Sequence, residues 1–157
     1  MMHGIIEFLV SSDKKAKILR ELFEFVIVPM LNPDGVILGN FRSGLAGDDL
    51  NRQYLKPETE FHPSVATLLN KIGNLKSERK VAIFMDLHGH STRPNVFSYG
   101  PELQKSDPLF DLVRLLPMIF GLESQAFKFT KSNWKINKGK KATARAVILD
   151  KLSKCFQ

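Results

Sequence analysis

Two runs of apolar residues stand out in the hydropathy pattern of the chain: EFVIVPML at 24–31 and VAIFMDL at 81–87. Both are rich in β-branched and aromatic residues, which predicts two buried strands. A third strand is expected in NVFSYG at 95–100, and a last one in ARAVIL at 144–149.

Apolar residues at helical spacing predict four helices, at 4–12, 14–23, 62–78 and 107–122. Asp13 is a suitable N-cap for the second helix. Pro63 suits the first turn of the third, whose apolar face comprises Val65, Leu68, Leu69 and Ile72. Pro117 is expected to end or kink the fourth helix.

Helices that alternate with buried strands predict an α/β fold. We expect a three-layer sandwich, in which helices flank a mixed, mostly parallel sheet, and the sequence shows no linker that would divide it into two domains. The NPDG sequence after the first strand predicts a turn, with Pro33 fixing φ and Gly35 accepting a positive φ. Residues 36–54 are expected to form a long ordered loop.

The composition fits a soluble globular domain, because 43% of the 157 residues are hydrophobic and 25% are charged. The apolar runs are too short to cross a bilayer, and no secretory signal is evident, so no membrane partner is expected. The one cysteine, Cys155, cannot form an intramolecular disulfide. This favours a reducing compartment, and we predict a cytoplasmic protein.

The net charge of +7 is concentrated in one part of the chain. Residues 125–157 hold nine Lys or Arg residues and one Asp, whereas the rest of the chain is close to neutral. A basic tail of this kind attracts an acidic partner, which could be nucleic acid, anionic lipid or an acidic polypeptide. Alternatively, it is a solvated tail without a partner.

Polar side chains follow both predicted buried strands. In open α/β sheets, ligands gather beyond the carboxyl ends of the strands, so NPDG and Asp86–His90 are expected to share one rim. His88 is a candidate zinc ligand, because it comes directly after the apolar run and Gly89 permits close approach. Alternatively, His88 only forms a hydrogen bond at the end of a strand.

A second candidate site lies in NFRSGLAGDDLNRQY at 40–54. Arg42 and Arg52, with Asn51 beside them, suit the binding of a carboxylate or a phosphate, because the guanidinium group presents a planar fork of donors. Alternatively, the two arginines are surface residues that pair with Asp48 and Asp49.

Together these stretches resemble a known family. VPMLNPDGVILGNFRSGLAGDDLNRQY, followed by MDLHGHSTRPNVFSYG, is similar to the cytosolic carboxypeptidases, within the carboxypeptidase A-like zinc metallopeptidases. The combination of NPDG, GNxR, DLNR and DLHGHS is specific, and the resemblance runs from the first helix to about Ile148. It implies a mixed eight-stranded sheet flanked by helices and one bound zinc. It also implies removal of C-terminal or branch-point glutamates from proteins such as tubulin.

The resemblance implies a role for each candidate residue. His88 corresponds to a zinc ligand, and Asn51 and Arg52 correspond to the pair that holds the terminal carboxylate of the substrate. Arg42 corresponds to the arginine that stabilises the developing oxyanion, a catalytic role. Arg145, within KGKKATARAVI, matches the base of the specificity pocket, where a cation suits a glutamate side chain. Alternatively, Arg145 belongs to the solvated basic tail.

The resemblance weakens around Arg145, because Ala142 and Ala144 replace the family's usual glycines. The lysines of this region would steer a glutamate-rich tail toward the pocket. They are Lys128, Lys131, Lys135, Lys138, Lys140 and Lys141.

Residues 1–157 are therefore expected to be a partial catalytic domain. The family's other two zinc ligands come from an HxxE motif, which the chain lacks, and its catalytic glutamate would lie beyond Gln157. Only His88 remains as an expected zinc ligand, so we expect the chain to be inactive by itself. It could be an incomplete fragment, which we favour, a noncatalytic paralogue, or a segment that another chain completes.

Two noncatalytic alternatives remain. The basic tail could bind nucleic acid through phosphate contacts and stacking on Phe129 and Trp134, although this leaves DLNR and DLHGHS unexplained. The chain could also be a metal-free module that binds acidic polypeptide tails.

Overall fold

The structure is a computed structural model that describes residues 1–153, apart from the side chain of Ser153, so Cys155 lies outside the described residues. The α-helices of this part are Met2–Val10 (α1), Lys14–Leu22 (α2), Pro33–Leu38 (α3), Pro63–Glu78 (α4), Leu112–Glu123 (α5) and Ala144–Ser153 (α6). Its 3₁₀ helices are Leu50–Arg52 (η1), Phe129–Lys131 (η2) and Lys138–Lys140 (η3). None of these helices combines the length and the apolar character that a membrane span requires.

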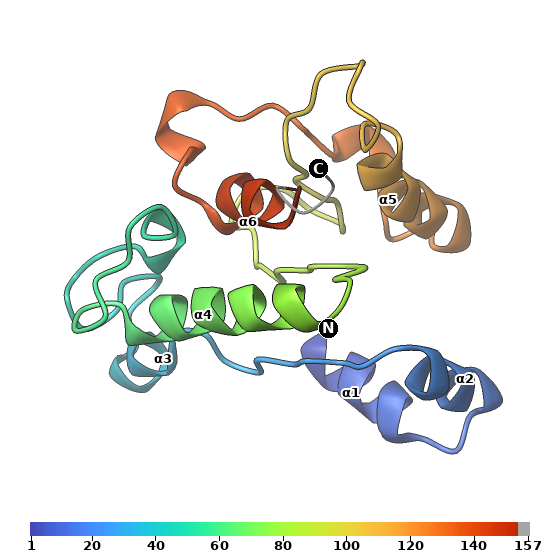
Figure 1. Ribbon diagram of the computed structural model, residues 1–157, viewed down its shortest axis with the longest axis horizontal. Helices are drawn as coiled ribbons and strands as arrows, with labels where there is room; N and C mark the ends of the chain where they lie inside the picture. The colour runs from blue at the N-terminus through green and yellow to red at the C-terminus, as the bar shows by residue number, and fades with distance from the viewer. Residues whose placement is uncertain (154–157) are drawn as a thin grey trace.

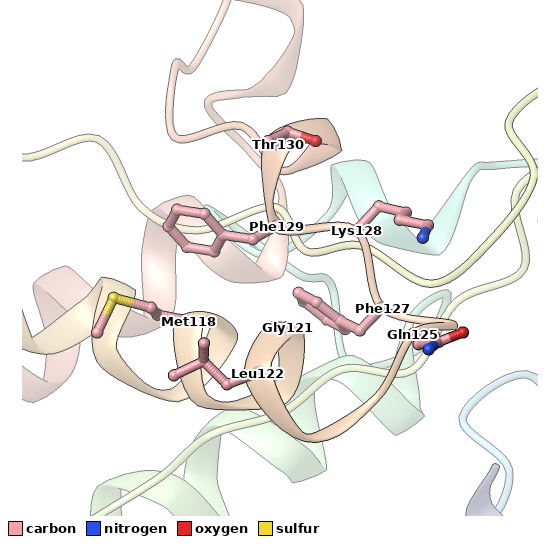
Figure 2. A pocket seen from close by; sticks show the side chains of 8 residues that line it. All are labelled: Met118, Gly121, Leu122, Gln125, Phe127, Lys128, Phe129 and Thr130. Atoms are coloured by element: carbon pink, nitrogen blue, oxygen red, sulfur yellow. The ribbon is translucent and has the colours of Figure 1, made fainter.

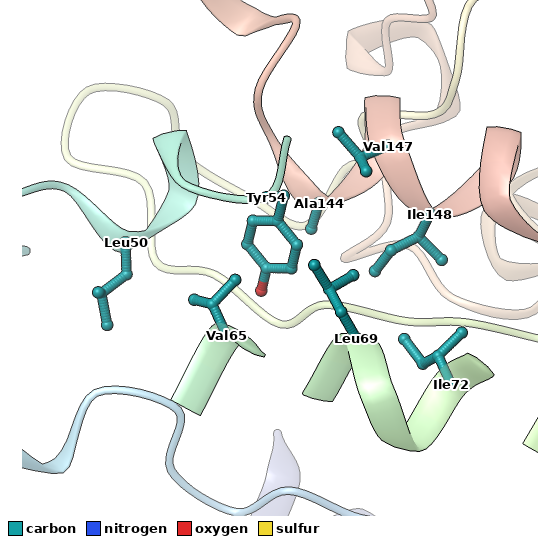
Figure 3. Packing of buried hydrophobic residues seen from close by; sticks show 8 residues of the cluster. All are labelled: Leu50, Tyr54, Val65, Leu69, Ile72, Ala144, Val147 and Ile148. Carbon is teal, nitrogen blue, oxygen red and sulfur yellow. The ribbon is translucent and has the colours of Figure 1, made fainter. Parts of the chain in front are cut away.

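The main core forms where α4 packs against α6, and α4 runs through the middle of the molecule (Figure 1). Figure 3 shows the ring of Tyr54 among side chains from both helices. The buried cluster consists of Leu50, Tyr54, Val65, Leu69, Ile72, Ala144, Val147 and Ile148. Because Leu50 and Tyr54 flank the polar end of η1, this core fixes the position of η1.

The four predicted helices are confirmed, with shifts at their ends. The side chain of Asp13 caps α2 by accepting a hydrogen bond from the Lys15 amide at 2.7 Å. Pro63 begins α4, and the predicted apolar face of that helix packs into the core. The last predicted helix begins later, at Leu112, and Pro117 lies inside α5 rather than at its end.

The NPDG sequence begins a helix, so the prediction of a turn there was wrong. The side chain of Asn32 accepts a hydrogen bond from the Gly35 amide at 3.0 Å, and Pro33 occupies the first turn of α3. Gly35 does not adopt a positive φ. A Cβ at this position would instead lie 2.8 Å from the Ser43 carbonyl oxygen, so close approach explains the glycine.

ARAVIL was wrongly predicted as a strand, because residues 144–149 belong to α6. Ala144, Val147 and Ile148 are spaced three and four residues apart, and all three are buried against the core. Packing of this face against α4 therefore outweighs the β-propensity of the β-branched residues.

The predicted sheet is not seen in the described residues. Segments 24–31 and 81–87 run as irregular chain, and isolated bridges join Ser43 to Asp49, Val96 to Phe127 and Tyr99 to Asn133. A strand requires backbone partners, and within residues 1–153 the two apolar runs do not pair with each other. Many of their side chains are exposed, including Met30 at 51% and Ile83 at 61%.

We predict that Ile148→Ala lowers the free energy of unfolding by about 2–5 kcal/mol, because Ile148 is only 1% exposed and its loss leaves a cavity. Ile37→Ala is the matched control, because Ile37 is 81% exposed, and should change it by less than about 0.5 kcal/mol. Urea denaturation followed by circular dichroism measures both. Equal losses would contradict the placement of α6 in the core.

Candidate functional site

The site is built around η1, which is attached to the start of α6. The Ala144 amide donates a hydrogen bond to Asn51 Oδ1 at 3.0 Å, and the Tyr54 amide donates to the Ala142 carbonyl at 3.2 Å. The first of these bonds spans 93 residues of sequence. It also fixes the orientation of the Asn51 amide, so that Nδ2 presents its N–H donors on the opposite side.

Asp49 holds the two candidate arginines together. Its Oδ1 caps η1 by accepting from the Asn51 amide at 3.0 Å. Its Oδ2 lies 3.0 Å from Arg42 Nε and 3.6 Å from Arg52 Nη1, and Arg52 Nη1 also donates to the Asn51 carbonyl at 2.7 Å. The alternative prediction that the arginines pair with an acidic neighbour is therefore correct for Asp49, whereas Asp48 bonds to His62.

His88 lies beside this cluster, although it is 37 residues away from Asn51 in the sequence. Its Nε2 is 2.8 Å from Asp86 Oδ2 and 3.4 Å from Asn51 Nδ2. The hydrogen bond with Asp86 raises the pKa of His88, while burial and the positive charge of Arg42 oppose that rise. The structure thus brings Arg42, Arg52, Asn51 and His88 into one neighbourhood. We call this set, with Asp49, the Asp49 cluster.

Arg145 is held by backbone carbonyl groups. Its Nη1 donates to the carbonyls of Gly100 at 2.6 Å and Asn133 at 3.4 Å, and its Nη2 donates to that of Lys135 at 3.0 Å. Burial lowers the pKa of Arg145, and the guanidinium group lies 5.2 Å from the centre of the Tyr99 ring. These contacts give Arg145 a structural task, and its recognition of a glutamate side chain stays a prediction.

Lys140 also lies within the field of the Asp49 cluster. Burial, followed by the positive charges of Arg52 and Arg42, lowers the pKa of Lys140, and Asp49 opposes this shift. The sequence placed Lys140 only among the steering lysines, all of which are exposed. Lys140 is therefore close enough to Arg42, Arg52 and Asp49 to interact with their charges.

The donors present fit only one position of a metal site. A histidine that bonds to a carboxylate through one ring nitrogen is a common arrangement for a metal ligand, and His88 with Asp86 has it. Among the residues that the structure describes, however, no group of three His, Cys, Asp or Glu side chains could hold a metal ion. His90 has a local role, because its Nδ1 accepts from the amides of Thr92 and Arg93.

An open groove lies elsewhere, between α5 and the segment that follows it (Figure 2). It is lined by Met118, Gly121, Leu122, Gln125, Phe127, Lys128, Phe129 and Thr130, and these residues do not belong to the Asp49 cluster. The aromatic rings proposed for base stacking pack within the protein. Trp134 lies 5.4 Å from Phe129 and 5.0 Å from the guanidinium carbon of Arg114, and it is only partly exposed.

Residues 1–146 match the family model described as zinc carboxypeptidase. The match covers most of the chain, and the chain belongs to this family.

Several relatives carry the name cytosolic carboxypeptidase. The chain is 40% identical over 149 residues to cytosolic carboxypeptidase 2 of Danio rerio, covering 94% of this chain and 21% of the relative. It is 40% identical over 161 residues to cytosolic carboxypeptidase 4 of Homo sapiens, covering 94% of this chain and 14% of the relative. The chain therefore spans about a fifth or less of the length of these relatives. The predicted family resemblance is confirmed.

Solved carboxypeptidase structures share the fold. A Shewanella denitrificans protein named for carboxypeptidase A superimposes with a TM-score of 0.81 and 29% identity, over 96% of this chain and 40% of that one. A metallo-carboxypeptidase from Burkholderia cenocepacia superimposes with a TM-score of 0.73 and 26% identity, over 96% and 40%. These similarities support an α/β domain, whereas the layers and strand order of the predicted sheet stay predictions.

We predict that Asn51→Ala lowers the free energy of unfolding by about 1–3 kcal/mol, because the Ala144 amide loses its acceptor. Asn51→Asp keeps an oxygen at that position and should retain most of the stability. Chemical denaturation of the two variants makes the comparison. A larger loss for Asn51→Asp than for Asn51→Ala would contradict the attachment of η1 to α6.

Proposed function

We propose that this chain provides the carboxylate-binding part of a zinc carboxypeptidase that removes glutamate from acidic protein tails. The observation that carries this proposal is the convergence of Arg42, Arg52 and Asn51 on Asp49, next to His88. Membership in the zinc carboxypeptidase family supports the reaction class. The names of the cytosolic relatives support action in the cytoplasm.

Binding of a ligand requires N–H groups of the arginines and of Asn51 that are not already paired within the protein. Within the described residues, the ion pair of Arg42 uses Nε, and the bonds of Arg52 use Nη1. The remaining guanidinium N–H groups and the Asn51 Nδ2 group can therefore donate to a terminal carboxylate. The bonds from the guanidinium groups join opposite charges, so they are stronger than bonds between neutral groups.

In the catalytic step, some residues orient the substrate and one stabilises the developing charge. We assign Arg52 and Asn51 to the terminal carboxylate, and Arg42 to the oxyanion that develops on the scissile carbonyl. The family implies a zinc ion that would polarise this carbonyl, and His88, held by Asp86, would be one of its ligands. The described residues do not complete the metal site, so the role that we assign to them is to bind and orient the substrate.

The preference for glutamate rests on the positive charge around the Asp49 cluster. Lys140 lies in the field of Arg42 and Arg52, and the other lysines of 128–141 are exposed. A polyglutamate tail, like that of tubulin, would be attracted by these charges and guided toward the arginines. We keep Arg145 as the residue nearest the glutamate side chain, acting through N–H groups that the carbonyl bonds leave available.

A second candidate function is the noncatalytic binding of acidic tails. The incomplete set of metal donors in the described residues favours this alternative, which uses the same arginines. The two functions differ in the effect of zinc. Under the noncatalytic alternative, zinc would not cause cleavage of the bound tail. Nucleic-acid binding receives less support, since Trp134 packs against Phe129 and Arg114.

The proposal predicts selective binding of a free C-terminal carboxylate. A triglutamate peptide should bind the purified chain at least about tenfold more tightly than the same peptide with a C-terminal amide, because amidation removes one charge-assisted interaction. Isothermal titration calorimetry at low salt measures both affinities. A peptide ending in phenylalanine tests the glutamate preference and should bind more weakly.

Arg52→Gln should abolish the difference between the acid and the amide. Arg79→Gln is a control that removes the same charge at a different place. Arg79 follows the C-terminal end of α4 and pairs with Glu24, so this variant should retain the difference in affinity (Figure 1). Equal affinities for the acid and amide peptides in the unmodified chain would contradict the proposal. Release of free glutamate from a polyglutamate peptide by a chain extended at both ends, with zinc present, would favour the enzyme over the noncatalytic alternative.

A further inference from the structure

A buried histidine lies behind the Asp49 cluster and has no part in the proposed reaction. His62 precedes the first turn of α4 and is only 4% exposed. Its Nδ1 accepts a hydrogen bond from the Glu58 amide at 3.1 Å, and its Nε2 lies 3.2 Å from Asp48 Oδ2. The ring therefore joins the start of α4 to the loop that carries Asp49.

These two partners determine the tautomer of His62. A ring nitrogen that accepts from a backbone N–H cannot itself carry a proton, so Nδ1 is unprotonated and Nε2 bears the hydrogen. That hydrogen points to the Asp48 carboxylate. The bond is directional, and a buried apolar ring of the same size could not replace it.

Backbone contacts connect Asp48, which His62 holds, to the position of Asp49. The Asp48 carbonyl accepts from the Gly44 amide at 3.0 Å, and a β-bridge joins Ser43 to Asp49. Arg42 comes directly before this bridge, and its Nε reaches Asp49 Oδ2 at 3.0 Å. The Arg42 side chain is 51% exposed, whereas the Asp49 side chain is 23% exposed. The position of Asp49 in the loop therefore determines the geometry of the Arg42–Asp49 ion pair.

We propose that His62 is a positioning residue, which sets Asp49 and, through it, the Arg42 guanidinium for anion binding. His62 acts through Asp48, and its two ring nitrogens both bond within the protein. The expected effect on ligand binding rests on the proposed function. The effect on the Arg42–Asp49 ion pair does not, because it can be measured without any ligand.

The first measurement uses the full chain without ligand. In ¹H–¹⁵N spectra of the arginine side chains, the Arg42 Nε–H should exchange slowly with solvent, because Nε lies 3.0 Å from Asp49 Oδ2 in an ion pair. His62→Phe keeps the ring but removes both nitrogen contacts, and should accelerate this exchange at least about fivefold, which is the loss of one ordinary hydrogen bond. His62→Gln keeps a donor within reach of Asp48 and should restore slow exchange.

Val65→Ala is the matched control for a purely structural effect. Val65 is fully buried in the first turn of α4, three residues after His62, so its truncation should lower the melting temperature. It should leave the Arg42 Nε–H exchange unchanged at a temperature where both variants are folded. If Val65→Ala and His62→Phe accelerate that exchange equally, or if His62→Phe leaves it unchanged, the positioning role is overturned.

The second measurement links positioning to binding. The ratio of affinities for triglutamate acid and triglutamate amide should fall about tenfold in His62→Phe and recover in His62→Gln. If the unmodified chain shows no such ratio, the proposed function fails, and the exchange of Arg42 Nε–H alone still decides the positioning role. A ratio that persists in His62→Phe would overturn the inference.

Discussion

The hydrogen bond from the Ala144 amide to Asn51 Oδ1 joins the core of this protein to its candidate site. On one side, Ala144 begins α6, which packs against α4 with Tyr54 enclosed between them. On the other side, Asn51 belongs to the short helix η1, which is too small to be stable alone. The position of η1 therefore depends on this bond and on the buried residues that flank it.

Charge is the second constraint on the site. Arg42, Arg52 and Lys140 are close enough to affect one another, and like charges at such separations repel. Asp49 offsets part of this repulsion and holds the two guanidinium groups by opposite charge. The guanidinium N–H groups that these ion pairs leave available can donate to an anion.

The sequence predicted the helices better than the other elements, because their apolar faces repeat at helical spacing over two or more turns. ARAVIL is shorter, and its β-branched residues fit a strand as well as its spacing fits a helix, so only packing against α4 decides between them. NPDG is equally ambiguous, because Asn and Pro favour both turns and helix starts. The apolar runs at 24–31 and 81–87 have strand composition, yet pairing depends on partners that local sequence does not specify.

The proximity of Arg42, Asn51, Arg52 and His88 followed from the family resemblance, since spacing alone does not relate His88 to Asn51. Asp49 was considered only as the partner in an alternative to ligand binding, whereas in the structure one carboxylate orients both arginines. The cap that Asp49 forms two residues before Asn51 was a signal available in the sequence. The contacts of Arg145 could not be predicted, because its partners are backbone carbonyls from three separate residues.

We infer that the Asp49 cluster forms a single anion-binding site. Titration of the isotope-labelled chain with N-acetylglutamate, followed by NMR of side-chain N–H groups, tests it most directly. We predict that the signals of Arg42, Arg52 and the Asn51 amide shift together with one dissociation constant, while that of Arg20 on α2 stays unchanged. Shifts with unrelated dissociation constants, or shifts confined to the lysines of 128–141, would contradict it.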